Sequence, residues 1–225
     1  MRIGIAGPLL ALWLTATSAS AEEPPLPVHF EAGLRAGLGL PVGNAVGPRT
    51  DAPGGTPLSN LVAWSLPLQL DAGARVGPVF VGGYLSWAYG KPGSAFDGAS
   101  SRSASDVRFG FEVLWHFAPD RAVDPWAGLG VGYEWLNLNV TGPSGNAVSA
   151  SFRGFEWVNV QLGVDFMLGR NWRLGPFVQA RVGQYDTGSL GVVTPQGAEP
   201  SGTSDLPSKS AHAWIDIGLR LGFLL

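Results

Sequence analysis

Residues 62–76 read VAWSLPLQLDAGARV and alternate between apolar and other residues with a period of two. Successive side chains of a strand point to opposite faces, so this pattern predicts a strand with one fully apolar face. Pro67 and Gly73 argue against a helix, because each would weaken a helix interior. The apolar face consists of Val62, Trp64, Leu66, Leu68, Leu70, Ala72, Ala74 and Val76.

Seven further stretches alternate in the same way and predict seven more strands. They lie at residues 28–40, 79–89, 105–117, 125–135, 157–168, 174–185 and 214–223. The connections are alternately long and short, and the long ones, rich in Gly, Pro, Asn and Ser, lie at 41–60, 91–104, 141–151 and 186–210. This organisation predicts an all-β fold: an eight-stranded antiparallel up-and-down transmembrane β-barrel with long extracellular loops and short periplasmic turns.

At three places the sequence predicts either a local irregularity in a strand or which of two neighbouring residues faces outward. Beyond Trp135 the apolar residues change parity, to Leu136 and Leu138, which predicts a bulge or the end of that strand. Pro67 cannot donate to a strand ladder, and we expect a local bulge there. In residues 157–168 the alternation places Val158 on the apolar face and Trp157 on the opposite one.

The contents of the two faces distinguish a membrane barrel from a soluble one. The apolar face carries Leu, Phe or Trp in nearly every strand, whereas the other face carries many glycines, which suit the narrow lumen of an eight-stranded barrel. Both lysines, Lys91 and Lys209, fall in predicted loops, although a soluble sheet would carry lysine on its wet face. The apolar face is therefore predicted to meet lipid, with an aromatic girdle near each end. The girdle residues are Trp64, Trp87, Tyr89, Trp115, Phe117, Tyr133, Trp135, Phe166 and Phe223.

The start of the chain predicts export. A basic start and an apolar run to Leu14 precede the small residues Ala19 and Ala21, which is typical of a signal peptide cleaved after Ala21. We therefore expect a signal peptide at 1–21, a proline-rich tether at 22–27 and one barrel domain at 28–225. The chain has no cysteine, so neither a disulfide framework nor a lipid-bearing cysteine is expected. A net charge of −3 without a basic stripe argues against a nucleic-acid partner.

The leader, the eight strands, PWAGLGVGYEW at 125–135 and the ending HAWIDIGLRLGFLL together resemble the small outer-membrane β-barrel proteins of the OmpA and OmpX type from Gram-negative bacteria. The resemblance covers essentially the whole mature chain and concerns architecture rather than activity. It implies location in the outer membrane, contact with outer-membrane lipid and assembly by the barrel-assembly machinery. Such proteins usually end on an aromatic residue that this machinery reads, whereas this chain ends on Leu225, with Phe223 two positions earlier. A periplasmic peptidoglycan-binding domain, present in some relatives, is not expected.

Charged residues on the predicted inward face nearly cancel, with six acids and five bases. Buried charges need partners, so we expect a salt-bridged polar plug that fills the lumen of a non-enzymatic barrel with a structural or loop-mediated binding role. The alternative is a narrow gated channel for ions or small solutes, in which these pairs change partners. The predicted lumen network comprises Glu31, Arg35, Asp71, Arg75, Arg108, Glu112, Glu134, Asp165, Arg181, Asp216 and Arg220.

Catalytic motifs are weak. Glu112 and His116 lie roughly 13 Å apart along one strand at ~3.3 Å per residue, too far for a dyad. Ser210 and His212 share a face near a loop end, as a lipid-modifying enzyme of the outer membrane would need, which is a second alternative. Glycines at 128, 130 and 132 recur with the period of a strand, so we expect them to relieve crowding in the lumen rather than bind phosphate. We therefore expect no catalytic residue, cofactor or metal, and a partner of unknown identity at the loops.

Overall fold

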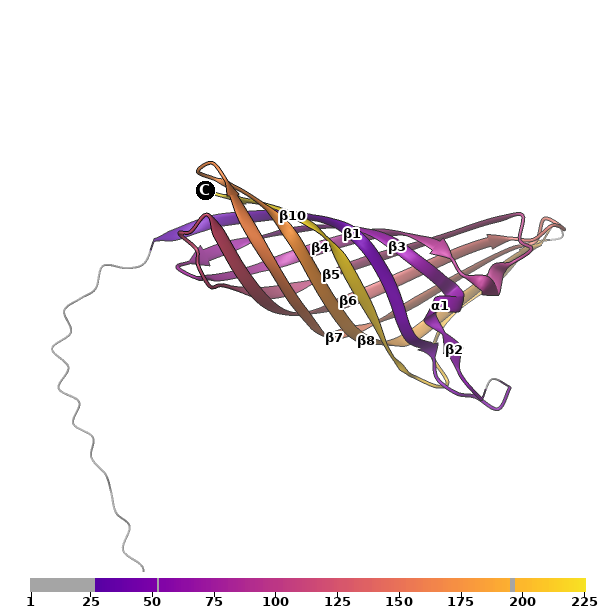
Figure 1. The fold of residues 1–225 in the computed structure, drawn as a ribbon. Helices are drawn as coiled ribbons and strands as arrows, with labels where there is room; N and C mark the ends of the chain where they lie inside the picture. The colour runs from indigo at the N-terminus through magenta and orange to yellow at the C-terminus, as the bar shows by residue number, and fades with distance from the viewer. Residues whose placement is uncertain (1–26, 52, 195–196) are drawn as a thin grey trace, which may run out of the picture.

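The computed structural model describes residues 27–51, 53–194 and 197–225 and shows a closed β-barrel (Figure 1). The eight strands of its wall are β1 (Val28–Val46), β3 (Val62–Val76), β4 (Val79–Pro92), β5 (Ser101–His116), β6 (Val123–Thr141), β7 (Ala147–Leu168), β8 (Trp172–Thr194) and β10 (Ala211–Leu224). The shorter elements are β2 (Thr56–Pro57), the helix α1 (Leu58–Leu61), the 3-10 helix η1 (Ser94–Phe96) and β9 (Gly197–Asp205). The predicted signal peptide, residues 1–21, lies outside the described residues, as does the tether apart from Pro27. No helix in the described ranges is long and apolar enough to cross a membrane.

Wall strands that follow one another in the chain pair antiparallel, and β10 closes the ring by pairing with both β8 and β1. Across the closing seam Arg35 of β1 lies opposite Arg220 of β10. Figure 1 shows the two ends of the barrel: the turn end, where the C-terminus lies, and the loop end, which carries β2 and α1. Two of the tight turns use Gly77 and Gly169 at positive φ, 57° and 84°, where glycine is favoured. The predicted eight-stranded antiparallel up-and-down barrel is confirmed.

The barrel is apolar outside and polar inside. On β3, Leu66, Leu68 and Leu70 are 48%, 46% and 57% exposed, whereas Gln69 and Asp71, on the opposite face, are buried. From Leu66 to Val76 the apolar face runs for about ten residues, or ~33 Å along the strand, which a tilt of about 40° reduces to ~25 Å of height. That height matches the apolar band of a transmembrane barrel.

The polarity of the two faces reverses above this band, at the loop end. Leu136 and Leu138 of β6 point inward and are buried, while Asn137 and Asn139 lie on the outside. The pairing of β5 with β6 continues without a register shift from His116 to Ser101. The predicted bulge or strand end after Trp135 is therefore wrong. The strand continues straight, but its outside passes from lipid to water, so the apolar side chains move to the inside.

An apolar core, which we call the head core, fills the barrel at the loop end. Segments distant in sequence contribute to it, because α1 and the end of β1 fold across the opening and meet β5, β6, β8 and β10. Phe96 and Leu206 pack against this core from the connections before β5 and after β9. The head core consists of Ala45, Val46, Leu58, Leu61, Val62, Ala104, Leu136, Leu138, Tyr185 and Trp214.

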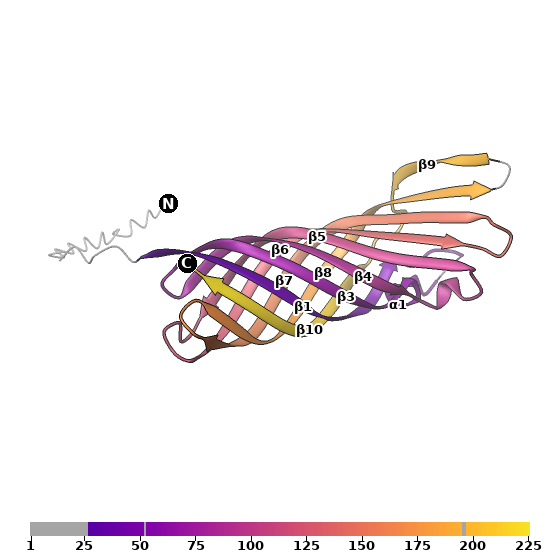
Figure 2. The same ribbon diagram turned by 90° about the horizontal axis from the view of Figure 1, so that it is seen from above.

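Several predicted connections are strand in the structure. The predicted loop 186–210 contains the end of β8 and the whole of β9, which pair as a hairpin that projects beyond the barrel (Figure 2). Likewise β1 continues to Val46 and pairs with β2 inside the predicted loop 41–60. Lys91 lies at the end of β4 and not in a loop. These extensions stand above the lipid band, where the alternation of apolar residues that marked the strands no longer applies.

Two predictions of local geometry are also wrong. The pairing of β1 with β3 has the same register on both sides of Pro67, so no bulge forms there; the ladder simply lacks partners for Leu66 and Pro67. Bulges lie instead in β7, where the register shifts between Glu156 and Val158, and in β8, where Asp186 falls between the partners of Arg153 and Gly154. As a result of the bulge in β7, Trp157 and Val158 both point outward, and Trp157 is 47% exposed rather than inside.

Candidate functional site

The lumen gathers nearly all charged side chains of the wall. All eleven residues of the predicted lumen network are buried inside the barrel, each at most 3% exposed. They form two groups, which we call the turn-side network and the loop-side network. Six further charged or titratable side chains complete these networks but were not predicted as members: Asp106, His116, Asp124, Glu156, Arg173 and His212.

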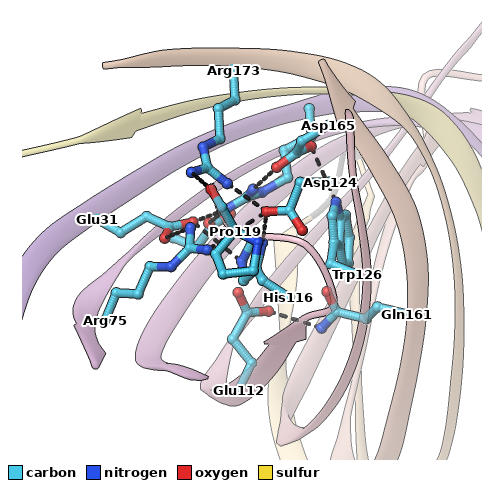
Figure 3. A network of polar contacts seen from close by, with 12 residues as sticks. Glu31, Arg75, Glu112, His116, Pro119, Asp124, Trp126, Gln161, Asp165 and Arg173 are labelled. Carbon is cyan, nitrogen blue, oxygen red and sulfur yellow. Dashed lines mark hydrogen bonds and ion pairs between the residues drawn. The ribbon is translucent and has the colours of Figure 1, made fainter. Parts of the chain in front are cut away.

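Arg220 is the centre of the turn-side network, and Figure 3 shows two of its partners, Glu31 and Asp165. Its Nη1 lies 2.7 Å from Asp165 Oδ2, and its Nη2 lies 2.7 Å from Glu31 Oε1 and 3.4 Å from Asp71 Oδ2. These partners come from β7, β1 and β3, so one guanidinium joins opposite sides of the wall. Trp126 Nε1 donates to the other oxygen of Asp165 at 3.1 Å. Asp165 is therefore itself held in place by a second donor.

Arg35 forms a second bridge across the same network. Its Nη2 donates to Glu112 Oε1 at 2.8 Å, and its Nη1 donates to Gln161 Oε1. Gln161 Nε2 in turn donates to the second oxygen of Glu112, Oε2, at 2.8 Å. The three side chains form a closed ring contributed by β1, β5 and β7. All three side chains are buried and come from strands that are not neighbours in the wall, so this ring spans the lumen.

At the turn end, Asp124 collects three side chains and one backbone group. His116 Nδ1 lies 2.8 Å from Asp124 Oδ2, and Arg173 Nη1 donates to the same oxygen at 2.5 Å. The backbone N–H of Ala118 donates to Asp124 Oδ1, and Arg75 Nη2 lies 3.6 Å from Asp124 Oδ2. Figure 3 shows this group beside Pro119, whose carbonyl accepts from Arg173. His116 thus pairs across the turn and not with Glu112.

The loop-side network is built around Glu134. Its carboxylate accepts from Arg108, Tyr185, His212 and Trp214, at 2.5 to 3.2 Å. The Arg108 guanidinium also pairs with Asp106 and lies over the ring of Trp214, 4.9 Å from its centroid.

Arg181 joins the remaining members of this network. It pairs with Asp216 at 2.7 Å and donates to Gln69 and Gln179. Nearby, Tyr84 donates to Glu156 across the lumen at 2.7 Å, and Arg181 Nε lies 3.9 Å from the other oxygen of Glu156. Each carboxylate of the loop-side network therefore has a guanidinium beside it.

Glycines on the inward face make room for the large side chains that fill the lumen. A Cβ atom added to Gly128 would lie 2.4 Å from Leu114, and one added to Gly132 would lie 2.2 Å from the hydroxyl of Tyr84. A Cβ atom added to Gly163 would lie 2.4 Å from the Trp126 ring. Large interior side chains are therefore accommodated by glycines on neighbouring strands. An apolar layer of Phe80, Leu114, Trp126 and Phe177 fills the lumen beside the turn-side network.

The Ser210 and His212 pair does not form a catalytic unit in the structure. His212 is buried, stacks on Tyr185 with ring centroids 4.1 Å apart, and directs Nε2 to Glu134. The Ser210 hydroxyl contacts the carbonyl of Ala211 instead. Within the described ranges, no group of three or more His, Asp or Glu side chains is arranged to hold a metal ion.

The nine predicted girdle residues lie on the outward face. Six are at least 36% exposed, and Trp64, Tyr133 and Phe223 are partly exposed. Aromatic contacts join neighbours on this face: Phe109 meets Tyr133 at 5.9 Å, and Trp172 meets Phe223 at 4.6 Å. Trp157 and Trp172 also face outward, although sequence reasoning did not place them in a girdle.

Comparison with known proteins gives the fold a context. No family model and no curated protein matches the chain. Among solved structures, a major outer membrane protein from Thermus thermophilus is similar with a TM-score of 0.55 and 13% identity, over 88% of this chain and 100% of that one. The fold is that of a small outer-membrane β-barrel. The outer membrane protein OprG from Pseudomonas aeruginosa is similar with a TM-score of 0.50 and 14% identity, over 86% of this chain and 95% of that one.

This fold fixes the orientation of the barrel. An exposed apolar band on an outer-membrane barrel places the protein in the outer membrane, with its long loops outside the cell and its short turns in the periplasm. The loop-side network and the head core therefore lie toward the extracellular side, and the turn-side network lies toward the periplasm.

Proposed function

We propose that the protein is a non-enzymatic outer-membrane barrel with a closed lumen, whose role is structural and whose extracellular head carries any contact with partners. Three layers close the lumen in succession: the turn-side network, the loop-side network and the head core. The observation that carries the proposal is the set of charged hydrogen bonds that cross the lumen, such as Arg220 to Asp165 and Arg35 to Glu112, each at 2.7 to 2.8 Å between buried groups.

The energetics of these pairs favour a plug over a pathway. Removing one partner of a buried ion pair typically costs about 3–5 kcal/mol, because it leaves an uncompensated charge. A gate that opened through the turn-side network would have to separate several such pairs at once. Both networks also mix acids and bases, whereas an ion-selective pathway would present rings of one sign.

Single-channel recording in planar bilayers tests the closed lumen. We expect the refolded mature protein to show no openings above leak at either polarity. Glu112→Ala and Arg220→Ala remove members of the turn-side network, and we expect both to stay silent because the loop-side network and the head core remain. Arg102→Ala, which alters an exposed cation paired with Asp97, serves as the control. Defined openings in the wild type that change with Glu112→Ala or Arg220→Ala would instead establish a channel.

A further inference from the structure

Among the described residues, the outward face of the barrel wall carries two charged side chains that are in no ion pair, and both are cations. Lys91 extends from the end of β4, and Arg153 extends from β7. Apart from Asp186, the acids of the described wall strands are buried in the lumen. Two other charged residues of the wall are at nearly the same level: Asp186 of β8 falls between the register partners of Arg153 and Gly154, and Arg102 of β5 lies one residue beyond the level of Lys91. Both are in ion pairs, Asp186 with Lys209 and Arg102 with Asp97. The lipid-facing surface is thus positive at its extracellular margin.

Both cations stand beside a tryptophan of the predicted extracellular girdle. In the strand registers Trp64 lies opposite Lys91, and Trp135 lies opposite Arg153. The Arg153 guanidinium lies over the Trp135 ring, 4.0 Å from its centroid. Tryptophan prefers the boundary between hydrocarbon and headgroups, so this arrangement holds the two charges at the depth of the lipid headgroups. The change from Trp135 to the polar Asn137 marks the same boundary on β6.

Neither cation is neutralised by the protein. The Lys91 side chain has no hydrogen bond or ion pair with any described residue, and the Arg153 side chain contacts only the Trp135 ring among the described residues. The Nε of Arg153 is inaccessible to solvent and lacks a hydrogen-bond acceptor in the described structure. That enclosed nitrogen is out of reach of a lipid, but the terminal nitrogens Nη1 and Nη2 are not enclosed and have no acceptor among the described residues, so an anionic oxygen from the surrounding leaflet can bind them.

From this arrangement we propose that Lys91 and Arg153 form a binding site on the outer wall for the phosphate groups of a phosphorylated lipid in the extracellular leaflet. Arginine binds phosphate through two parallel N–H donors, while lysine binds it as a point charge. The cations are separated by the strands β5 and β6, so one broad headgroup or two neighbouring ones would be held against the outward faces of those strands. The acyl chains would lie on the apolar band below.

Counting lipids that remain bound to the barrel tests this site. The protein is reconstituted in phosphatidylcholine vesicles doped with bisphosphorylated lipid A or, separately, with dephosphorylated lipid A, and retained lipid is measured by native mass spectrometry. We expect preferential retention of the phosphorylated form. Each cation near an anionic surface contributes about fivefold in affinity, so Lys91→Gln and Arg153→Gln should each lower the preference roughly fivefold, and the double variant about 25-fold.

Matched variants separate a specific site from general charge. Arg102→Gln removes an exposed cation of the same end of the barrel and should leave the preference unchanged. Arg153→Lys keeps the charge but loses the planar donor pair, so it should retain part of the preference. Heat-modifiable migration on gels verifies that each variant is folded. Equal retention of both lipids by the wild type, an equal loss in Arg102→Gln, or abolition of retention by inorganic phosphate added as a competitor would each overturn the proposal.

Discussion

At the scale of the residue, Glu134 concentrates more polar contacts than its single charge suggests. Replacing it by Gln removes the charge that Arg108 and His212 face, and it also puts an amide donor beside the donor of Tyr185. We expect Glu134→Gln to lower the free energy of unfolding by about 3–5 kcal/mol, as for other broken buried ion pairs. Urea unfolding of the protein refolded into lipid vesicles, followed by tryptophan fluorescence, measures this change.

The exposed pair of Arg102 and Asp97 provides the control. Its two side chains lie 2.8 Å apart, but that of Asp97 is 73% exposed. Asp97→Asn should therefore change stability by no more than about 1 kcal/mol. If the two substitutions cost the same, burial does not govern the strength of the lumen pairs.

Residue types and faces could be predicted from the sequence, but pairings could not. The alternation in each strand places Glu112 and Arg220 on the inward face, and the structure places them there. Which acid meets which base depends on the register between strands and on the lumen that separates them. Tyr84 reaches Glu156 only because a bulge at Trp157 returns Glu156 to the inward face. The one signal for that bulge is the odd spacing between two polar residues, Glu156 and Asn159.

At the scale of the element, α1 is short but closes the extracellular end of the barrel. Leu58 is fully buried in the head core, whereas Leu190 of the projecting β8–β9 hairpin is 58% exposed. Leu58→Ala should cost about 2–5 kcal/mol, because it removes buried methyl groups and leaves a cavity. Leu190→Ala should lie within about 0.5 kcal/mol of the wild type. Guanidinium unfolding in detergent micelles compares the two, and similar losses would show that the head core is not tightly packed.

Element boundaries were predicted well within the lipid band and poorly above it. β3 begins and ends at the predicted residues, because its outward face meets lipid along almost its whole length. β6 and β8 extend past the band. On β6 the outside there is polar and the inside apolar, whereas the extension of β8 pairs with β9 in the hairpin beyond the barrel. A prediction that assumes an apolar outward face along the whole strand interprets that reversal at Leu136 as the end of the strand. Because one strand contacts lipid along part of its length and water along the rest, its boundary is predicted correctly inside the lipid band and wrongly above it.

At the scale of the whole molecule, the orientation of the barrel is directly testable. An epitope inserted after Ser144, in the connection between β6 and β7, should be labelled by antibody on intact cells because it lies at the loop end. The same epitope after Asp120, between β5 and β6, should be labelled only after the outer membrane is permeabilised. Fluorescence of labelled cells measures both. Labelling of the Asp120 insertion on intact cells would reverse the assigned topology.

The hydrogen bonds across the lumen also connect strands that are not neighbours in the wall. Arg220, on the closing strand β10, is tied to Glu31, Asp71 and Asp165 on three other strands, and Arg35 is tied to β5 and β7. Separating any two neighbouring strands therefore requires breaking side-chain hydrogen bonds inside the lumen as well as the backbone hydrogen bonds between the two strands. The wall consequently has no mechanically weak seam at its turn-side half, and a sideways pull on the closing strands is shared around the full circumference.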